Sequence, residues 1–144
     1  MLRVNKLTDY GSVILAFMAS RPDQVMSAAS LSRDLLLPLA TVRKLLKMLV
    51  NSGLLCSSLG KQGGYQLARS ADKISLAEII NVLEGGIELT DCAMKEGLCR
   101  IEGSCEIRQN WQGLNQIVQR SLSQVSLQEM LVPRERAQKI ISGS

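Results

Sequence analysis

The sequence contains no histidine and only four aromatic residues among its 144. Without histidine the chain lacks the usual general base, so nucleophilic catalysis by one of its cysteines has no evident partner. No carboxylate pair or nucleotide-binding loop stands out either, and the sequence predicts that the protein is not an enzyme. The scarcity of aromatic residues leaves Leu, Ile, Val, Met and Ala to build the core, which favours a mainly helical fold.

Long apolar runs are also absent. No stretch approaches the ~20 residues needed to span a bilayer, and the charged N-terminus MLRVNKLTDYG does not resemble a secretory signal. We therefore expect no membrane association and a cytoplasmic location, where thiols stay reduced. Clustered cysteines in that compartment are interpreted first as metal ligands or redox sensors.

Positive charge is concentrated in the first half of the chain. Residues 1–73 carry ten Lys/Arg and four Asp/Glu, a net charge of +6, whereas residues 74–144 carry seven and nine, a net charge of −2. This asymmetry suggests that the first half meets a polyanion such as nucleic acid. A solvated basic face is the alternative.

A helix is expected over about residues 6–19. Its apolar stripe has steps of three, four and three and consists of Leu7, Tyr10, Ile14 and Phe17. Asp9 lies about 200° around the helix axis from Leu7, so its carboxylate should point away from that stripe.

A helix-turn-helix is expected next. Ser27 can cap a short helix through about residue 35, and Pro38 suits the first turn of a second helix that ends before Gly53. The second helix should bury an apolar face and expose three cations on the other side: Arg43, Lys44 and Lys47. Two ordinary packed helices are the alternative reading.

The segment LLCSSLGKQGGYQLA, residues 54–68, predicts a β-hairpin with a glycine-rich tip. We expect positive φ at Gly63 and Gly64, an exposed Lys61, and Cys56 as a small core residue of the first strand. A hairpin that directly follows a helix-turn-helix is the wing of a winged helix, and a basic tip can lie along a phosphate track.

Farther along, Ser75 and Glu78 form a capping box for a helix that ends at Gly85. A longer helix of about five turns begins near residue 107. Its narrow apolar seam comprises Ile107, Trp111, Leu114, Val118, Leu122 and Val125. A helix this long in a small domain favours packing against another subunit, and core packing within one chain is the alternative.

Between these helices lie three cysteines in the spacing C-x6-C-x5-C: Cys92, Cys99 and Cys105. Structural zinc sites usually contain C-x2-4-C pairs, and neither gap here is that short. Wide gaps suit an iron–sulfur cluster, whose irons need ligands from several directions. A disulfide with one leftover thiol is the redox alternative.

The motifs LTDYGSVILAFMA, SLSRDLLLPLATVRKLLKMLVNSGLL, GKQGGYQLAR, ISLAEIINVLEGGIELTDC and GSCEIRQNW occur in that order over about residues 1–130. In this order they resemble the IscR/NsrR-type iron–sulfur winged-helix regulators of the Rrf-two family, and among these the regulators of SUF iron–sulfur assembly genes.

The resemblance implies a homodimer that reads a pseudo-palindromic DNA operator and binds a [2Fe-2S] or [4Fe-4S] cluster. The three loop cysteines match the family's ligand positions one for one. Where some members have a histidine ligand this chain has Arg108, which cannot ligate iron. Asp9 stands where other members supply an acidic ligand from the partner subunit. An N-terminal helix charge is the other reading of Asp9.

The expected fold class is mainly α with a small β-hairpin wing, a winged helix-turn-helix with a long C-terminal dimerisation helix. The expected division is 1–84 for DNA binding, 85–106 for the cysteine loop, 107–132 for the dimerisation helix and 133–144 for a tail. The residues expected to contact DNA are Arg43, Lys44, Lys47, Lys61, Gln62, Gly63 and Tyr65. Leu59 replaces an arginine that many members carry in the wing.

The expected function is a transcriptional repressor of iron–sulfur assembly genes. A nitric oxide or redox sensor of the same family is one alternative. An iron–sulfur carrier or electron-transfer module is the other.

Overall fold

The computed structural model describes residues 3–94 and 96–132. Most of the chain is helical, with one hairpin of two antiparallel strands, as the sequence predicts. In chain order the elements are α1 (Lys6–Ala19), α2 (Ala28–Leu35), α3 (Leu39–Asn51), β1 (Leu55–Ser58), β2 (Gly64–Leu67), the 3-10 turn η1 (Ala71–Lys73), α4 (Leu76–Glu84), α5 (Asp91–Met94), η2 (Glu102–Ser104), α6 (Arg108–Ser123) and α7 (Leu127–Met130).

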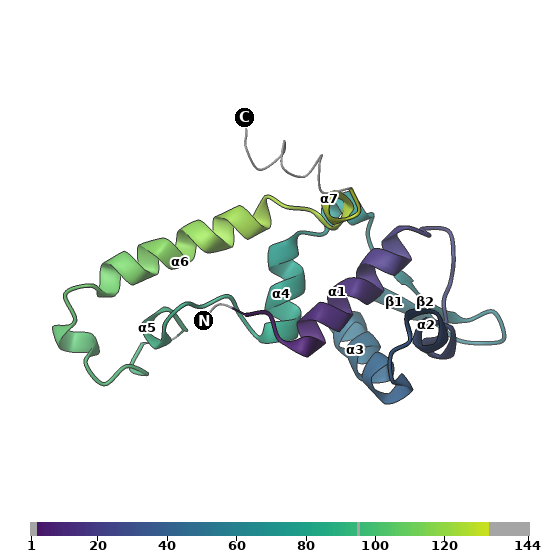
Figure 1. The fold of residues 1–144 in the computed structure, drawn as a ribbon, viewed down its shortest axis with the longest axis horizontal. Coiled ribbons are helices and arrows are strands. Elements are labelled where there is room, and N and C mark those ends of the chain that lie inside the picture. The colour runs from purple at the N-terminus through teal and green to yellow at the C-terminus, as the bar shows by residue number, and fades with distance from the viewer. Residues whose placement is uncertain (1–2, 95, 133–144) are drawn as a thin grey trace.

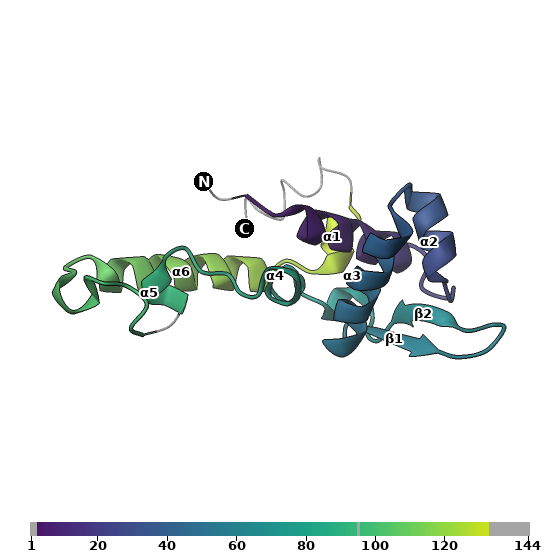
Figure 2. The ribbon, with the colours of Figure 1, turned by 90° about the horizontal axis from the view of Figure 1, so that it is seen from below.

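The molecule is elongated, and its two specialised parts lie at opposite ends (Figure 1). The α2–α3 pair and the hairpin are at one end. The helix α6 extends away from them and carries α5 and the cysteine segment at the other end (Figure 2).

The expected helix-turn-helix is present. Ser27 caps α2 by accepting a hydrogen bond from the backbone N–H of Ser30, and Leu36 ends that helix in the left-handed conformation. Pro38 is the residue before the first turn of α3, one position earlier than expected, with an extended ψ of 133°. The apolar side of α3 is fully buried, while Arg43, Lys44 and Lys47 are exposed, as predicted.

The buried face of α1 differs from the expected stripe by about one residue. Of the four predicted residues only Ile14 is fully buried, and the innermost face also includes Thr8, Gly11 and Leu15. At Gly11 a Cβ atom would come within 2.5 Å of Leu83 on α4. The absence of a side chain at this position lets α1 and α4 approach closely. The face of α1 that contains Gly11 is therefore buried, in place of the more hydrophobic face that the sequence predicts.

The hairpin pairs Leu55 with Leu67 and Ser58 with Gly64. Positive φ occurs at Gly60 and Gly64, and Gly63 does not have it. Gly63 is required instead by crowding, because a Cβ atom there would collide with the carbonyl oxygen of Ser58. Cys56 is exposed and not a core residue, since in β1 only Leu55 faces the interior.

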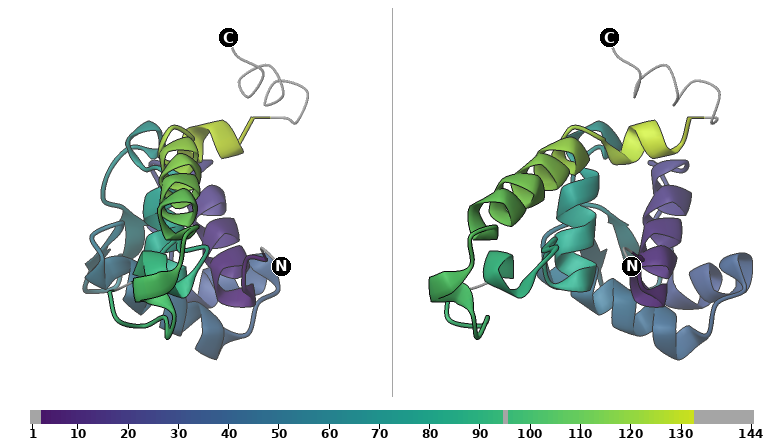
Figure 3. Two further views of the ribbon diagram at one scale, coloured as in Figure 1. Left: turned by 90° about the vertical axis from the view of Figure 1, so that its left-hand side faces the viewer. Right: turned by 60° about the vertical axis from the view of Figure 1, so that its left-hand side comes forward.

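The expected helix from residue 107 is interrupted. The helix α6 ends at Ser123, and Ser126 begins the short helix α7 with a capping box to Glu129. Leu127 is only 1% exposed and belongs to the core of the winged helix. Its N–H donates to the carbonyl of Ile74 at 2.8 Å, and the N–H of Leu76 donates to the carbonyl of Val125 at 2.8 Å. Figure 3 shows α7 lying across the end of α1.

Candidate DNA-binding face and cysteine loop

The exposed face of α3 and the wing share a groove. Arg43 and Lys47 of α3 line it together with Tyr65 of β2. The backbone of Tyr65 also forms two hydrogen bonds with Met26, at 2.8 and 2.9 Å, which hold the wing against the segment before α2. Cations, an aromatic hydroxyl and a fixed wing are therefore brought together on one surface. Sequence reasoning missed two polar residues of the groove, Asn51 and Ser57, whose positions depend on the fold.

The tip of the wing lies farther out. Lys61 and Gln62 are exposed there, and Gly63 is half-buried against the turn. Leu59, at the position where the resemblance implies an arginine in many family members, is fully exposed. Arg69 does not substitute for that arginine at the tip, because its guanidinium binds Glu78 at 2.7 Å and the carbonyl of Lys73 at 3.0 Å.

The cysteine segment leaves α4 at Gly85 and returns to α6. Cys92 lies in α5, and its side chain falls outside the described part of the structure. Cys99 and Cys105 are half-buried free thiols on either side of η2. Among the described residues no three Cys, Asp or Glu side chains are gathered as a ready metal site. The donor chemistry of these soft thiols fits iron–sulfur binding.

A carboxylate organises this loop. Glu102 accepts a hydrogen bond from the backbone N–H of Gly97 at 2.5 Å and pairs with Nη2 of Arg108 at 2.5 Å. Gly97 has a φ of 86°, a left-handed conformation that glycine adopts without strain. Glu102 therefore ties the turn after α5 to the first residue of α6.

The start of the segment is attached to α6 by two amides. Asn115, only 6% exposed, accepts a hydrogen bond from the N–H of Leu89 at 2.9 Å. Gln119 donates to the carbonyl of Ile87 at 3.1 Å. Since both amides lie on the face of α6 toward the segment, they hold the approach to the cysteines parallel to the helix (Figure 1).

Asp9 is exposed near the start of α1, as expected. That end of α1 is anchored to α4 by Glu84, which accepts hydrogen bonds from Thr8 Oγ1 at 2.7 Å and from Asn5 N and Nδ2 at 2.9 and 2.8 Å. The hydrogen bond from the Thr8 hydroxyl, then that from the Asn5 backbone, lowers the pKa of Glu84 below its ordinary value of 4.5. The first turn of α1 is thereby fixed relative to the segment that leads to the cysteines.

Replacing Glu84 by Gln should reduce the pH dependence of stability. A carboxylate whose pKa is lowered in the folded state stabilises the fold above its ordinary pKa, and the contribution is lost as pH falls through the folded value. We expect Glu84→Gln to lower the free energy of unfolding at pH 7 by about 1 kcal/mol or less, because the site is exposed. The difference should vanish in acid. Urea unfolding between pH 3 and pH 7 measures this, with Glu88→Gln as the control, and a pH-independent difference contradicts it.

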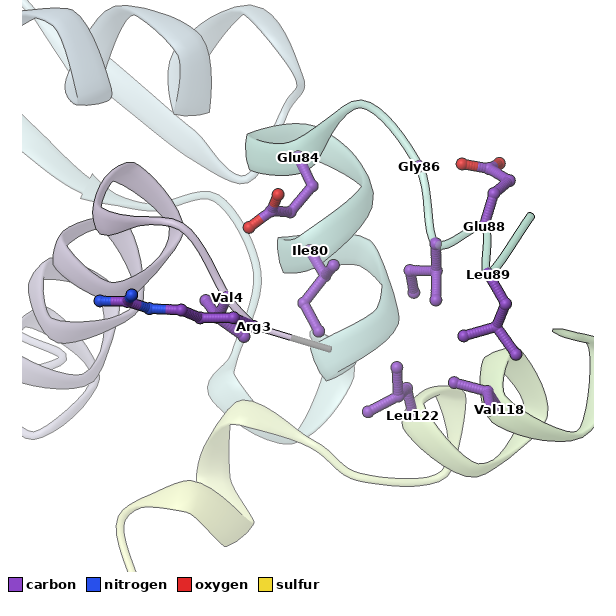
Figure 4. A pocket seen from close by; sticks show the side chains of 10 residues that line it. Arg3, Val4, Ile80, Glu84, Gly86, Glu88, Leu89, Val118 and Leu122 are labelled. Carbon is purple, nitrogen blue, oxygen red and sulfur yellow. The ribbon is translucent and has the colours of Figure 1, made fainter. Parts of the chain in front are cut away.

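The apolar residues of α6 fall into two groups. Ile107, Trp111 and Leu114 are 54%, 38% and 47% exposed, and Ile117, which sequence reasoning missed, is 60% exposed. Val118 and Leu122 are half-buried instead and line a pocket of about 280 Å³. Figure 4 shows these two side chains facing Ile80 and Leu89 across it. Val125 lies beyond the end of α6.

The structure contains a helix-turn-helix followed by a hairpin wing, and the cationic face of α3 shares a groove with an aromatic residue of the wing. These features define a winged-helix transcriptional regulator. None of the described helices is long and apolar enough to cross a membrane.

The chain belongs to the Rrf2 family, described as iron-dependent transcriptional regulators, whose sequence pattern matches residues 4–133. The members of this family are transcriptional regulators and not enzymes, which confirms the prediction that the protein is not an enzyme. The HTH-type transcriptional regulator IscR of Xenorhabdus nematophila is 32% identical over 97 residues, covering 67% of this chain. The matched region spans 58% of the length of that relative.

Solved structures agree with this assignment. CymR, the global cysteine regulator of B. subtilis, has a TM-score of 0.71 and 26% identity, covering 91% of this chain and 97% of CymR. IscR of T. potens has a TM-score of 0.69 and 25% identity, covering 90% and 86% respectively. The winged-helix fold class is therefore confirmed.

Proposed function

We propose that this protein is a homodimeric DNA-binding repressor of iron–sulfur cluster assembly genes that senses its signal through a cysteine-bound cluster. In this proposal residues 1–84, completed by α7, bind a pseudo-palindromic operator. Residues 85–106 hold the cluster, and α6 forms the dimer. The observation that carries DNA binding is the groove in which Arg43 and Lys47 meet Tyr65.

DNA binding follows from the geometry of that groove. The N-terminal half of a recognition helix enters the major groove. Arg43 and Lys44 lie in the N-terminal half of α3, and their side chains are exposed. Lys61 and Gln62, at the far end of the wing, can contact phosphates outside the major groove. Their separation from α3 suits a protein that contacts the duplex at two places.

Dimerisation is supported by the exposed apolar residues of α6. A stripe of Ile107, Trp111 and Leu114 in water would be unfavourable, since each buried side chain of this size contributes about 1.5–3 kcal/mol. Val118 and Leu122 belong to the same seam but line the pocket beside α4 within the chain, so the more exposed residues would carry the interface. A second copy of α6 is the partner that matches this stripe along its length.

The cysteine site would be held by Cys92, Cys99 and Cys105, with Asp9 of the partner subunit as the fourth ligand. When bound, an iron–sulfur cluster supplies a redox-sensitive and removable link between the loop and the dimer. Asp9 suits this role because its carboxylate is exposed, while its helix turn is fixed through Glu84. An oxygen ligand binds such iron more weakly than a thiolate, which makes the site labile.

The test is to prepare the protein anaerobically and to measure iron, sulfide and visible absorbance per chain. We expect serine at any of the three loop cysteines to remove the iron, and Cys56→Ser, in the wing, to retain it. Asp9→Ala should lower iron retention and change the electron paramagnetic resonance spectrum of the dithionite-reduced cluster, with Asp23→Ala as the matched control. An unchanged cluster in Asp9→Ala would exclude the ligand role.

The same samples are then titrated with DNA from the protein's own promoter by fluorescence anisotropy. Wild-type protein should bind with affinities that differ by about 5-fold or more between the loaded and stripped forms, whereas Cys99→Ser should show a single affinity. An absence of DNA binding in both forms would favour an iron–sulfur carrier. Loss of the cluster with nitric oxide at constant iron supply would favour the nitric oxide sensor.

A second candidate is a regulator that responds through its own cysteine thiols, without a cluster. The observation that favours it is the pair of half-buried free thiols, Cys99 and Cys105, in a chain that CymR matches over 91% of its length. In that case the iron-free protein would bind the promoter, and its affinity would depend on thiol oxidation instead of iron.

A further inference from the structure

The last part of the cysteine loop contains an arginine with one unpaired donor. Nη2 of Arg108 pairs with Glu102 at 2.5 Å and lies 3.7 Å from Glu96. The Nε–H of the same side chain is buried and has no hydrogen-bond partner among the described residues. A buried donor without an acceptor is unfavourable, so an anionic acceptor that formed beside it would be stabilised.

Cys105 lines the same pocket as Arg108. Arg108 and Cys105 line one polar pocket together with Glu102, and Cys105 precedes Arg108 by three residues. Arg108 is also the first residue of α6, where the aligned N–H groups of the helix favour negative charge. The pocket therefore combines the Cys105 thiol and the carboxylates of Glu96, Glu102 and Glu106 with a cation that has a buried, unpaired N–H donor.

We propose that Arg108 is a positioning residue of the cysteine site, which donates its Nε–H to the Cys105 thiolate when that thiolate binds a metal. This inference rests on the proposed cysteine site. A metal-bound thiolate keeps negative charge and accepts hydrogen bonds from N–H donors, which tune the metal that it binds. Arg stays protonated and cannot become a ligand itself.

Glu102 fixes the arginine in this position. One carboxylate oxygen holds Nη2 of Arg108, and the other accepts the N–H of Gly97. The guanidinium is therefore restrained through Nη2, and its Nε–H remains without an acceptor among the described residues. Glu102 would stabilise the conformation of the loop. Arg108 would stabilise the same conformation and would also donate a hydrogen bond to the Cys105 sulfur.

The test uses Co²⁺ alone, added anaerobically to reduced, metal-free protein, because cobalt bound by thiolates has a sulfur-to-metal charge-transfer absorption. We expect Arg108→Gln to weaken Co²⁺ binding by about 10- to 100-fold. The charge-transfer band should also move to longer wavelength, because a thiolate without a hydrogen-bond donor gives up an electron more easily. Arg108→Lys should lie between these results, and Arg100→Gln, an exposed charge in the same loop, should match wild type.

Hydrogen exchange separates the structural role from the electronic one. Both Glu102→Gln and Arg108→Gln should accelerate exchange of the Gly97 amide about 10-fold or more, because each loosens the same charged contact. Arg108→Gln should shift the cobalt band clearly more than Glu102→Gln, because it removes the donor itself and not only the contact that holds it. An equal shift in Glu102→Gln, or an Arg108→Gln protein that matches Arg100→Gln, overturns the role of Arg108. If wild-type protein binds Co²⁺ without any thiolate band, the proposed cysteine site fails together with this inference.

Discussion

Leu127→Ala should destabilise the protein by about 2–5 kcal/mol, although the residue follows the long helix and lies far from the rest of the core in sequence. Leu127 is 1% exposed and is one of the largest fully buried side chains. It packs in the same cluster as Ile74 and Ile79, and its N–H donates to the carbonyl of Ile74. The substitution leaves a cavity in a closely packed region, where the surroundings relax only partly.

Met130→Ala is the matched control, because Met130 lies on the same short helix and is 53% exposed. Chemical denaturation followed by circular dichroism measures both variants, and we expect Met130→Ala to stay within about 0.5 kcal/mol of wild type. Similar losses in the two variants would mean that α7 is not part of the core. We also expect Leu127→Ala to accelerate hydrogen exchange, relative to wild type, more in α7 than in α3, because α7 would detach first.

The triple replacement of Arg43, Lys44 and Lys47 by Gln should weaken DNA binding by about 100-fold or more at moderate salt. Each charged contact to phosphate or base contributes roughly 1–3 kcal/mol. Because about 0.9 counterion is released per neutralised phosphate, the slope of log K against log salt should fall by up to nearly 3. All three side chains are exposed and take no part in the packing of α3, so the fold should persist.

A control with the same change of charge is the triple replacement of Lys73, Arg100 and Arg120 by Gln, on parts of the molecule away from the α3 face. Anisotropy titrations at several salt concentrations compare the two proteins on the promoter and on random DNA. We expect the control to retain most of its affinity and slope. Equal losses in both proteins would mean that net charge, and not the face of α3, determines binding.

Elements whose signals lie within a few residues were predictable from the sequence. The cap at Ser27, the capping box of Ser75 with Glu78 and the glycines at the ends of α3 and α4 all act through hydrogen bonds between near neighbours. The exposure of Arg43, Lys44 and Lys47 followed from helical periodicity alone. A comparable signal, Ser126 with Glu129, marked α7, but the apolar seam suggested that the helix continued.

Errors arose where distant elements compete for the same surface. The face of α1 that is buried depends on how closely α4 approaches Gly11, and this approach is a property of two helices together. Cys56 is exposed because a two-stranded hairpin has only one covered side, and β1 contributes only Leu55 to it. Part of the seam, Val118 and Leu122, packs near α4 within the chain, while Ile107 and Trp111 remain exposed.

By itself, the sequence determined the helix-turn-helix, the wing, the cationic face of α3 and the three cysteines before a long helix, because local hydrogen bonds and periodicity carry this information. Only the tertiary structure decided that Leu127 completes the core, that Glu84 anchors the turn carrying Asp9, and that Glu102 joins Gly97 to Arg108. The contacts of Leu127 and Glu84 join residues far apart in the chain, and those of Glu102 cross an irregular loop without a periodic pattern. Each therefore exists only once the packed elements bring the side chains together.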